Sequence, residues 1–289
     1  MTHDRLANEQ RVAAWTCPSC RAAVTTPFCP GCGERPIVAA DLSLKGIVAQ
    51  LAKAVGGVDG RLLRTLRGLL RHPGSLTLAY AEGRRKPLVG PLQLFLLANV
   101  AFFAAQSLTH MRVFSSSLAS HLHQQDWSAL AQDLVADRLA ATRTTLEAYA
   151  PLFDRAVVLH AKSLVIAMVP PFAIALPLLF LRSRQPFSVH LAFALHFYAF
   201  VLLLFCLCLA AAAVAVLFGS RGLESAPVDN ALTGLIVVAS ALYLYAAAAT
   251  VYGARGLAGA VKAIVLAIWV VVIVVAYRFA MLLVTLYTT

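Results

Sequence analysis

Long apolar runs constrain this chain more than any other feature of its sequence. A helix needs about 20 apolar residues to cross roughly 30 Å of hydrocarbon. Five runs meet that length, at residues 91–108, 163–181, 189–218, 231–252 and 260–287. With 60% hydrophobic and 13% charged residues, the chain does not have the composition of a soluble domain. The sequence therefore predicts an all-α polytopic membrane protein with five transmembrane helices.

The chain divides into three predicted regions. Residues 1–40 are an N-terminal extension and a cysteine-rich unit, residues 41–90 form amphipathic and interfacial helices, and residues 91–289 form the five-helix transmembrane domain. No cleavable signal peptide is expected, because residues 1–40 contain no apolar core segment. An amphipathic helix is predicted over 41–55, with its apolar side chains on one face.

A long outer loop, residues 111–162, separates the first two predicted spans. The stretch that starts at Asp126 and runs to Leu146 predicts a helix outside the membrane, and residues 154–162 extend the second spanning helix outward. His121 and His123 in this loop form a weak metal pair, because no third ligand is evident.

Two Cys-x-x-Cys knuckles, separated by eight residues, define the N-terminal unit. Their thiols belong to Cys17, Cys20, Cys29 and Cys32. Four thiolates suit one tetrahedral Zn²⁺ ion and leave no open coordination position, so the predicted zinc is structural. Two disulfides are the alternative. The unit resembles the miniature zinc ribbons of bacterial membrane proteins, except that Arg21 stands where the first knuckle usually has glycine. Its small, exposed surface also suits a cytosolic protein partner.

Two basic clusters precede the first apolar run. The first is a helix in which arginines recur at helical spacing, with leucines mostly on the opposite side, and His72-Pro73-Gly74 ends it. The predicted headgroup-binding residues of both clusters are Arg61, Arg64, Arg67, Arg71, Arg84, Arg85 and Lys86. Such a helix can lie in the membrane surface with its cations towards anionic lipid headgroups. Because much of the net charge of +11 lies here, no nucleic-acid partner is expected.

The distribution of cations between the loops predicts the orientation. With the N-terminus inside, 17 Lys and Arg residues lie on the inner side and 6 on the outer side. Cytoplasmic loops carry the excess of Lys and Arg. The sequence therefore predicts a multi-pass protein of a bacterial inner membrane, with a cytosolic N-terminus and an external C-terminus.

Polar residues within the predicted spans are the candidates for an intramembrane site. His196 lies six residues beyond His190, about 9 Å deeper, and the two rings point about 120° apart, so they cannot share one metal ion. An ionisable residue at such depth faces other helices or a wet cavity. His196 either bonds a neighbouring helix or serves a lipid, a substrate or a proton. Arg278 either snorkels to the outer interface or pairs with His196 or an outer acid.

Prolines interrupt the second predicted span at Pro170-Pro171 and Pro177. Each proline removes a backbone donor and frees a carbonyl group that neighbours or water must satisfy. A broken helix of this kind either lines a transport site or is a packing kink.

Three motifs carry a family resemblance. They are Arg71-His72-Pro73-Gly74 with Tyr80, Gly83-Arg84-Arg85 and Pro91; the string from His190 to Phe197; and Val251-Tyr252-Gly253. Together they resemble a bacterial membrane-protein family catalogued only as a domain of unknown function, with an N-terminal zinc ribbon and several spanning helices. The resemblance adds Tyr252 to the intramembrane candidates and implies no established reaction.

Two functions follow as hypotheses. The first is a non-enzymatic membrane protein that binds anionic lipid headgroups and acts in lipid transport or membrane organisation. The alternative is a small-solute or proton-coupled transporter with a site between helices two, three and five. No arrangement of catalytic residues, phosphate-binding loop or second metal cluster is evident in the sequence, so an enzyme is not expected.

Overall fold

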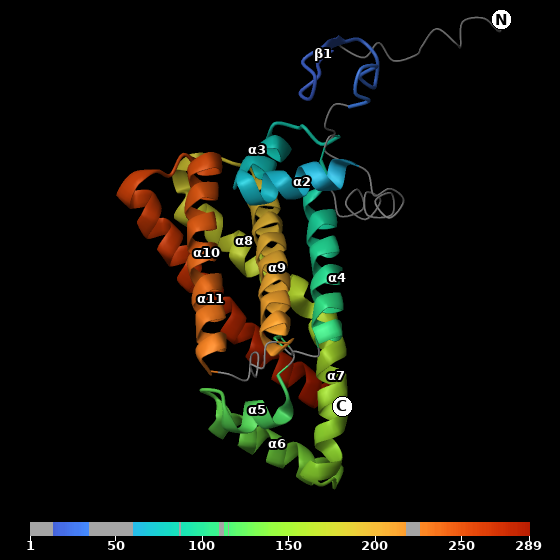
Figure 1. Ribbon diagram of the computed structural model, residues 1–289, viewed down its shortest axis with the longest axis vertical. Helices are drawn as coiled ribbons and strands as arrows, with labels where there is room; N and C mark the ends of the chain where they lie inside the picture. The colour runs from blue at the N-terminus through green and yellow to red at the C-terminus, as the bar shows by residue number, and fades with distance from the viewer. Residues whose placement is uncertain (1–13, 35–59, 87, 110–112, 115, 218–225) are drawn as a thin grey trace, which may run out of the picture.

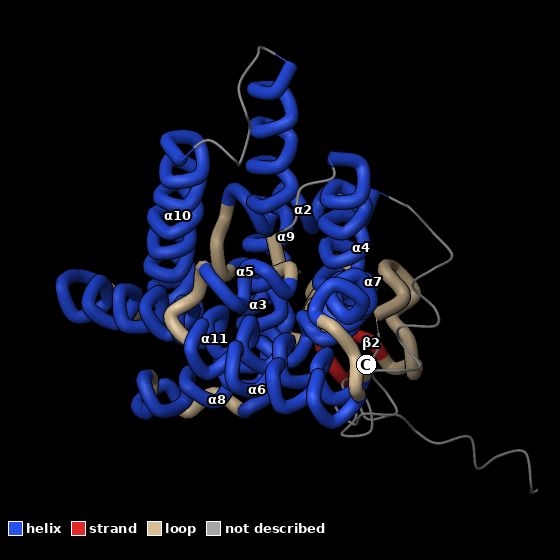
Figure 2. The backbone as a smooth tube through the Cα atoms, turned by 90° about the horizontal axis from the view of Figure 1, so that it is seen from below, coloured by secondary structure: helices blue, strands red, loops and turns tan. Residues whose placement is uncertain are grey.

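The structure is a computed structural model that describes residues 14–34, 60–86, 88–109, 113–114, 116–217 and 226–289. The amphipathic helix predicted over 41–55 lies outside these residues. The elements are β1 (Trp15–Thr16), β2 (Ala23–Val24), α2 (Gly60–Arg71), α3 (Ser75–Ala81), α4 (Pro91–Thr109), α5 (Leu118–His123), α6 (Ser128–Thr142), α7 (Leu146–Leu164), η2 (Val165–Met168), α8 (Val169–Leu179), η3 (Leu181–Ser183), α9 (Phe187–Leu217), α10 (Ala226–Tyr252) and α11 (Gly256–Thr288). The two strands pair antiparallel in the N-terminal unit, and helices make up most of the remainder (Figures 1 and 2).

The long helices indicate a multi-pass membrane protein. Four of the described helices are long and apolar enough to cross a membrane: Pro91–Thr109, Phe187–Val216, Asn230–Tyr252 and Gly256–Thr288. The bent pair of α7 and α8 makes a fifth if it counts as one span. Large apolar side chains such as Leu242, Val261 and Ile268 are exposed on these helices, as lipid contact requires. The four helices overlap the predicted spans closely, with ends that differ by up to four residues.

The second predicted span differs most from its expected form. The chain bends by 60° between Leu146–Ala161 and Val165–Leu179, with the 3₁₀ segment η2 at the bend. The predicted interruption is present, and Pro170 and Pro171 lie directly after the bend, in the first turn of α8. Proline suits that turn, where the missing N–H would have no intrahelical partner. Of the three prolines, only Pro177 lies in the interior of α8, beyond its first turn.

Helix α9 is the centre of the bundle. Its first half is apolar on every side, and nearly every side chain from Val189 to Leu202 is buried. A helix with apolar side chains all round must be surrounded by other elements. Helices α4 and α10 lie on either side of α9 in both ribbon views, and α3 and α8 also contact it (Figures 1 and 2). His190 and His196, the buried polar side chains of this half of α9, are therefore surrounded by neighbouring helices, and the packing of those helices sets their partners.

The two ends of the bundle differ in structure. At one end lie α2 and α3, with the cysteine-rich unit beyond them, and at the other lie α5, α6 and the C-terminus (Figure 1). We call the first the basic end, defined by α2, α3 and the loop Glu82–Lys86, and the second the far end, defined by α5 and α6. The helix predicted from Asp126 to Leu146 is α6, which ends at Thr142 because Arg143 adopts a left-handed conformation. The predicted outward extension over 154–162 falls within α7.

Candidate functional site

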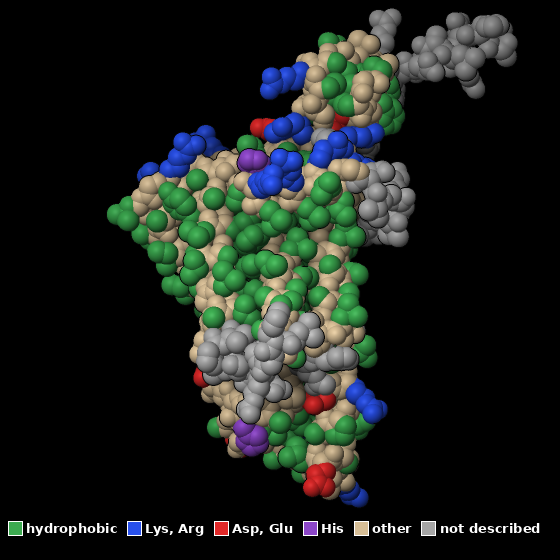
Figure 3. All heavy atoms as spheres, in the orientation of Figure 1, with side chains coloured by type: hydrophobic (Ala, Val, Ile, Leu, Met, Phe, Trp, Pro, Cys, Tyr) green, Lys and Arg blue, Asp and Glu red, His purple; other side chains and the backbone are tan. Residues whose placement is uncertain are grey.

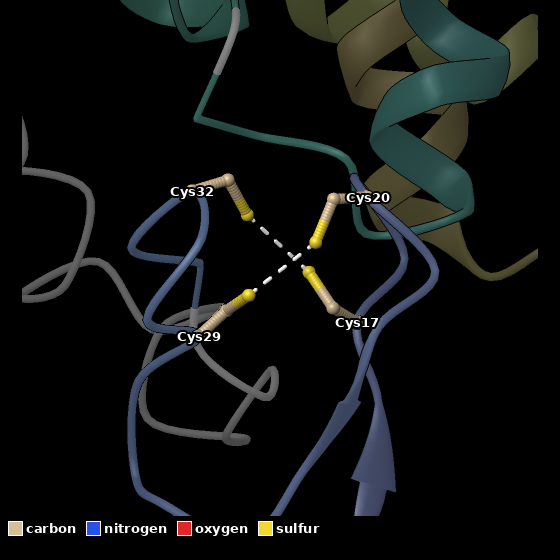
Figure 4. Close-up of side chains that lie close together, drawn as sticks. All are labelled: Cys17, Cys20, Cys29 and Cys32. Carbon is tan, nitrogen blue, oxygen red and sulfur yellow. Dashed lines mark hydrogen bonds between the residues drawn. The ribbon is translucent and has the colours of Figure 1, made fainter.

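The four knuckle cysteines converge on one point. Their sulfur atoms all lie within 4.8 Å of one another, and the side chains point inward from both knuckles (Figure 4). The Sγ atoms of Cys17 and Cys32 are 3.4 Å apart, and those of Cys20 and Cys29 are 3.3 Å apart. A tetrahedral ion with bonds of about 2.3 Å would place its sulfurs roughly 3.8 Å apart, so the cluster fits a metal with little movement. All four cysteines are free thiols.

The local backbone favours thiolates in this cluster. Backbone hydrogen bonds close both knuckles, from Arg21 to Cys17 and from Gly33 to Cys29. A hydrogen bond from the backbone of Cys32 is the largest factor that lowers the pKa of Cys29, to about 6. A lowered pKa populates the thiolate that binds metal at neutral pH. Backbone hydrogen bonds also lower the pKa of Cys20 and Cys32, but the neighbouring thiols and burial raise both pKa values above the usual value of a thiol. Within residues 14–34, which the structure describes, the unit buries only Cys17, Val24 and Cys29 as its own apolar core, so a bound ion would supply most of its stability.

Arg21 and Gly33 hold equivalent positions in the two knuckles, and both have positive φ angles, of 60° and 69°. Glycine adopts this conformation freely, whereas a side chain there costs about 1–2 kcal/mol. We therefore expect Arg21→Gly to raise the metal affinity about fivefold, because binding no longer has to offset that strain. Competition with a chromophoric chelator measures the change. Arg21→Ala is the matched control, since it removes the charge but keeps the Cβ, and an equal gain in both variants would contradict the strain argument.

Helix α2 forms as predicted, but its apolar face has a different role. Leu69 and Thr65 are buried, Leu62 and Leu66 are partly buried, and this face packs on the bundle. The Thr65 hydroxyl accepts a hydrogen bond from the Val89 backbone, 2.9 Å away, and so ties α2 to the start of α4. The sequence alone had suggested that the leucine face lies in the membrane surface. In the structure this face packs on the bundle and is not free to insert into lipid.

The outward face of α2 remains cationic. The four arginines of the first cluster, Arg61, Arg64, Arg67 and Arg71, are exposed. Leu63 and Leu70 are exposed beside them, at 73% and 55%. Because residues seven apart share one stripe of a helix, these two leucines lie in line among the arginines. Lysine and arginine side chains gather at this end of the molecule, while apolar side chains cover the visible middle (Figure 3).

The side chains of the second basic cluster contact other residues of the protein. Arg84 forms an ion pair with Glu82 on the same loop. The guanidinium of Arg85 lies over the ring of Tyr80, 5.1 Å from its centroid. Lys86 is exposed, and its ammonium group lies next to Gly33 of the cysteine-rich unit. The predicted headgroup residues thus separate into an exposed group on α2 and a loop group with contacts inside the protein.

Helix α3 connects the basic end to the predicted intramembrane histidines. Gly74, with φ of 84°, turns the chain from α2 into α3 and lies directly against Ala247 and Thr250 of α10. The Oγ1 atom of Thr77 is 2.9 Å from Nδ1 of His196, and both side chains are buried. This bond between α3 and α9 agrees with the interpretation that His196 holds neighbouring helices together.

His190 lies in an aromatic stack nearby. Its Nδ1 atom is 2.9 Å from the Tyr252 hydroxyl, and the two rings are stacked. The Tyr252 ring also stacks on Phe180, with the ring centroids 4.2 Å apart, and Lys262 lies over the Phe180 ring. Residues from α9, α10 and α11 and the residue that follows α8 thus meet here. The helices α3, α9 and α10, next to or within which the three sequence motifs lie, contact one another.

Arg278 lies elsewhere. Its Nη2 atom donates to the carbonyl group of Val113, 3.3 Å away, in the segment that leads to α5. This places the guanidinium towards the far end, whereas His196 bonds to α3 at the basic end. The side chains of Glu224 and Asp229, the outer acids considered as partners of Arg278, lie outside the described part of the chain. Of the histidines predicted as a weak metal pair, His121 is buried and accepts from the Trp127 indole, while His123 is exposed.

Sequence reasoning missed two residues of this region. Glu34 is 3% exposed and binds the loop of the second cluster, and Thr77 binds His196. An acid immediately after the second knuckle of a very basic chain was the available signal for Glu34. Thr77 gave none, because a threonine within a short apolar helix is common.

Residues 59–103 match the model of a family described as "Protein of unknown function (DUF3667)". The match covers α2, α3 and most of α4, which includes the first of the three motifs. No curated protein and no solved structure matches the chain. The segment that builds the basic end is therefore similar to an uncharacterised family.

Proposed function

We propose that this chain is a non-enzymatic integral membrane protein that binds anionic lipid headgroups at its basic end. In this proposal the basic end faces the cytoplasm of a bacterial cell, the C-terminus lies outside, and the cysteine-rich unit holds one structural Zn²⁺ ion. Lipid transport and membrane organisation are the roles that such a headgroup site would serve.

The observation that carries the proposal is the outward face of α2. Four exposed arginines and two exposed leucines occupy one helix, whose opposite face is fixed to the bundle beside the start of α4. Helix α2 lies beside the start of α4, which begins a candidate span (Figure 1), and in the proposed orientation this position would be at the level of the headgroups. Arginine binds phosphate oxygens through paired N–H groups, and the leucines would reach the adjacent acyl chains.

The charge around α2 supports the same assignment. Arg182 and Arg184 after α8 and Arg255 before α11 are exposed in the connections that return to this end. At the far end, by contrast, acids balance the cations: α6 and α7 carry Asp133, Asp137 and Glu147 together with Arg138 and Arg155. A one-sided excess of Lys and Arg favours the cytoplasmic side and attracts anionic lipid.

The test is lipid binding by the full-length protein in detergent micelles, titrated with fluorescent phosphatidylglycerol or phosphatidylcholine. We expect tighter binding of phosphatidylglycerol, which weakens as salt rises. The double variant Arg64→Gln, Arg67→Gln should weaken binding about thirtyfold, since each surface cation contributes about 1 kcal/mol.

The matched control is Arg143→Gln, Arg155→Gln, which removes two exposed cations near the far end. This control should leave binding unchanged. Equal binding of the two lipids, or an equal loss in both double variants, would refute the proposal.

A further inference from the structure

The cysteine-rich unit makes a specific contact with the loop before α4. One carboxylate oxygen of Glu34, Oε2, accepts hydrogen bonds from the backbone N–H groups of Arg85 and Lys86, at 3.2 and 3.0 Å. The same oxygen accepts from the Ser19 hydroxyl of the first knuckle at 2.7 Å. Glu34 is 3% exposed, so one buried carboxylate joins the metal unit to the loop of the second basic cluster.

The position of Glu34 depends on the second knuckle. Its backbone carbonyl group accepts from the N–H of Cys29 at 2.7 Å, so the residue is fixed by the turn that presents the thiolate. Gly33 lies under the Lys86 side chain, since a Cβ at Gly33 would be 2.9 Å from the ammonium nitrogen. Both contacts come from residues directly after Cys32.

We propose that the cysteine-rich unit, the metal unit of this chain, is a metal-dependent clamp on the loop Glu82–Lys86. Its docking surface binds a segment of the same chain and not a separate protein. Glu34, Ser19 and Gly33 form the surface, and the backbone of Arg85 and Lys86 is the segment it binds. Metal binding orders the knuckles, and the ordered knuckles hold Glu34 where it restrains the loop. Loss of the metal releases the loop and the cations on it.

A buried carboxylate suits this task. Its buried negative charge must be compensated by hydrogen-bond donors, and three donors bind Oε2. Two of the donors are backbone N–H groups, so the contact fixes the path of the loop without using the side chains of Arg85 and Lys86. The inference stands without the lipid-binding proposal, because it concerns only contacts within the chain.

The test is amide hydrogen exchange of the full-length, zinc-loaded protein in detergent, read at Arg85 and Lys86. Glu34→Ala should speed exchange of these two amides about tenfold, the effect expected when a charge-assisted hydrogen bond is lost. Zinc stoichiometry should not change, since Glu34 is not among the four sulfur ligands. Removal of zinc from the wild-type protein should give the same increase, and removal from Glu34→Ala should add nothing.

Glu82→Ala is the matched control, because it removes another acid of the same loop, one that contacts the Arg84 side chain. It should leave the two amides protected. Ser19→Ala, which keeps the carboxylate on both amides, should cause a smaller increase than Glu34→Ala and shows that the fold tolerates a change here. Unchanged exchange in Glu34→Ala, unchanged exchange after zinc removal, or loss of zinc from Glu34→Ala would each overturn the clamp.

Discussion

Replacement of Cys17 with serine is expected to remove the metal from this protein and to unfold the cysteine-rich unit while the helical bundle survives. Cys17 is fully buried at the centre of a unit whose apolar core has only three buried members. Structural zinc contributes about 10–16 kcal/mol in peptides of similar size, far more than such a core can supply. We therefore expect zinc to fall from one ion per chain to less than one tenth after dialysis against a mild chelator.

Metal content and amide exchange measure the two parts of this prediction. Amides of residues 15–34 should exchange within seconds in the variant, and those of α9 should stay protected. Cys206→Ser is the control, because this cysteine lies in α9, away from the cluster. Full zinc occupancy in Cys17→Ser would show that the four thiols do not act as one site.

Replacement of Gly74 with alanine is expected to detach α3 from α10 and to destabilise the bundle by about 3 kcal/mol. The new Cβ would lie 2.8 Å from the carbonyl oxygen of Ala247 and 2.9 Å from the Cβ of Thr250, and a backbone atom cannot rotate away. Overpacking of this kind costs about 1–3 kcal/mol, and a φ of 84° adds about 1–2 kcal/mol for a residue with a side chain. Thermal unfolding in detergent, followed by thiol labelling of buried Cys208, measures the change.

Two further glycines separate these contributions. Gly253 has φ of 67° and open space around its Cβ position, so Gly253→Ala measures the backbone cost alone. Gly234 lies in α10 with open space and no positive φ, so Gly234→Ala should be neutral or slightly stabilising. The expected order of stability is Gly234→Ala, then Gly253→Ala, then Gly74→Ala. A Gly74→Ala variant no weaker than Gly253→Ala would contradict the close approach of α3 to α10.

These predictions concern neighbouring parts of the molecule, because the sequence motifs cluster at the basic end. The turn at Gly74, the bond from Thr77 to His196 and the stack of His190 on Tyr252 join α3, α9 and α10. The metal unit reaches the same end through Glu34. The cysteine-rich unit and the cationic helix α2 thus both contact the segment that leads into α4.

Much of the local structure follows from the sequence because its causes are local. The spacing of Cys17, Cys20, Cys29 and Cys32 brings four sulfurs within 4.8 Å, since each knuckle is a tight turn. Apolar length predicts where helices run, and His72-Pro73-Gly74 ends α2 where the backbone requires it. The arginines of α2 face outward because charged side chains remain in contact with water or headgroups.

Only the tertiary structure decided which groups meet. Thr77 and His196 are 119 residues apart in sequence, and no periodicity within either helix encodes their bond. Glu34 binds backbone groups 51 and 52 residues away, which carry no side-chain signature. The position of the bend between α7 and α8, and the burial of the α2 leucines on the bundle, depend on neighbouring helices. Local sequence sets the shape and polarity of each element, whereas the partner of a buried polar group is set by how the elements pack.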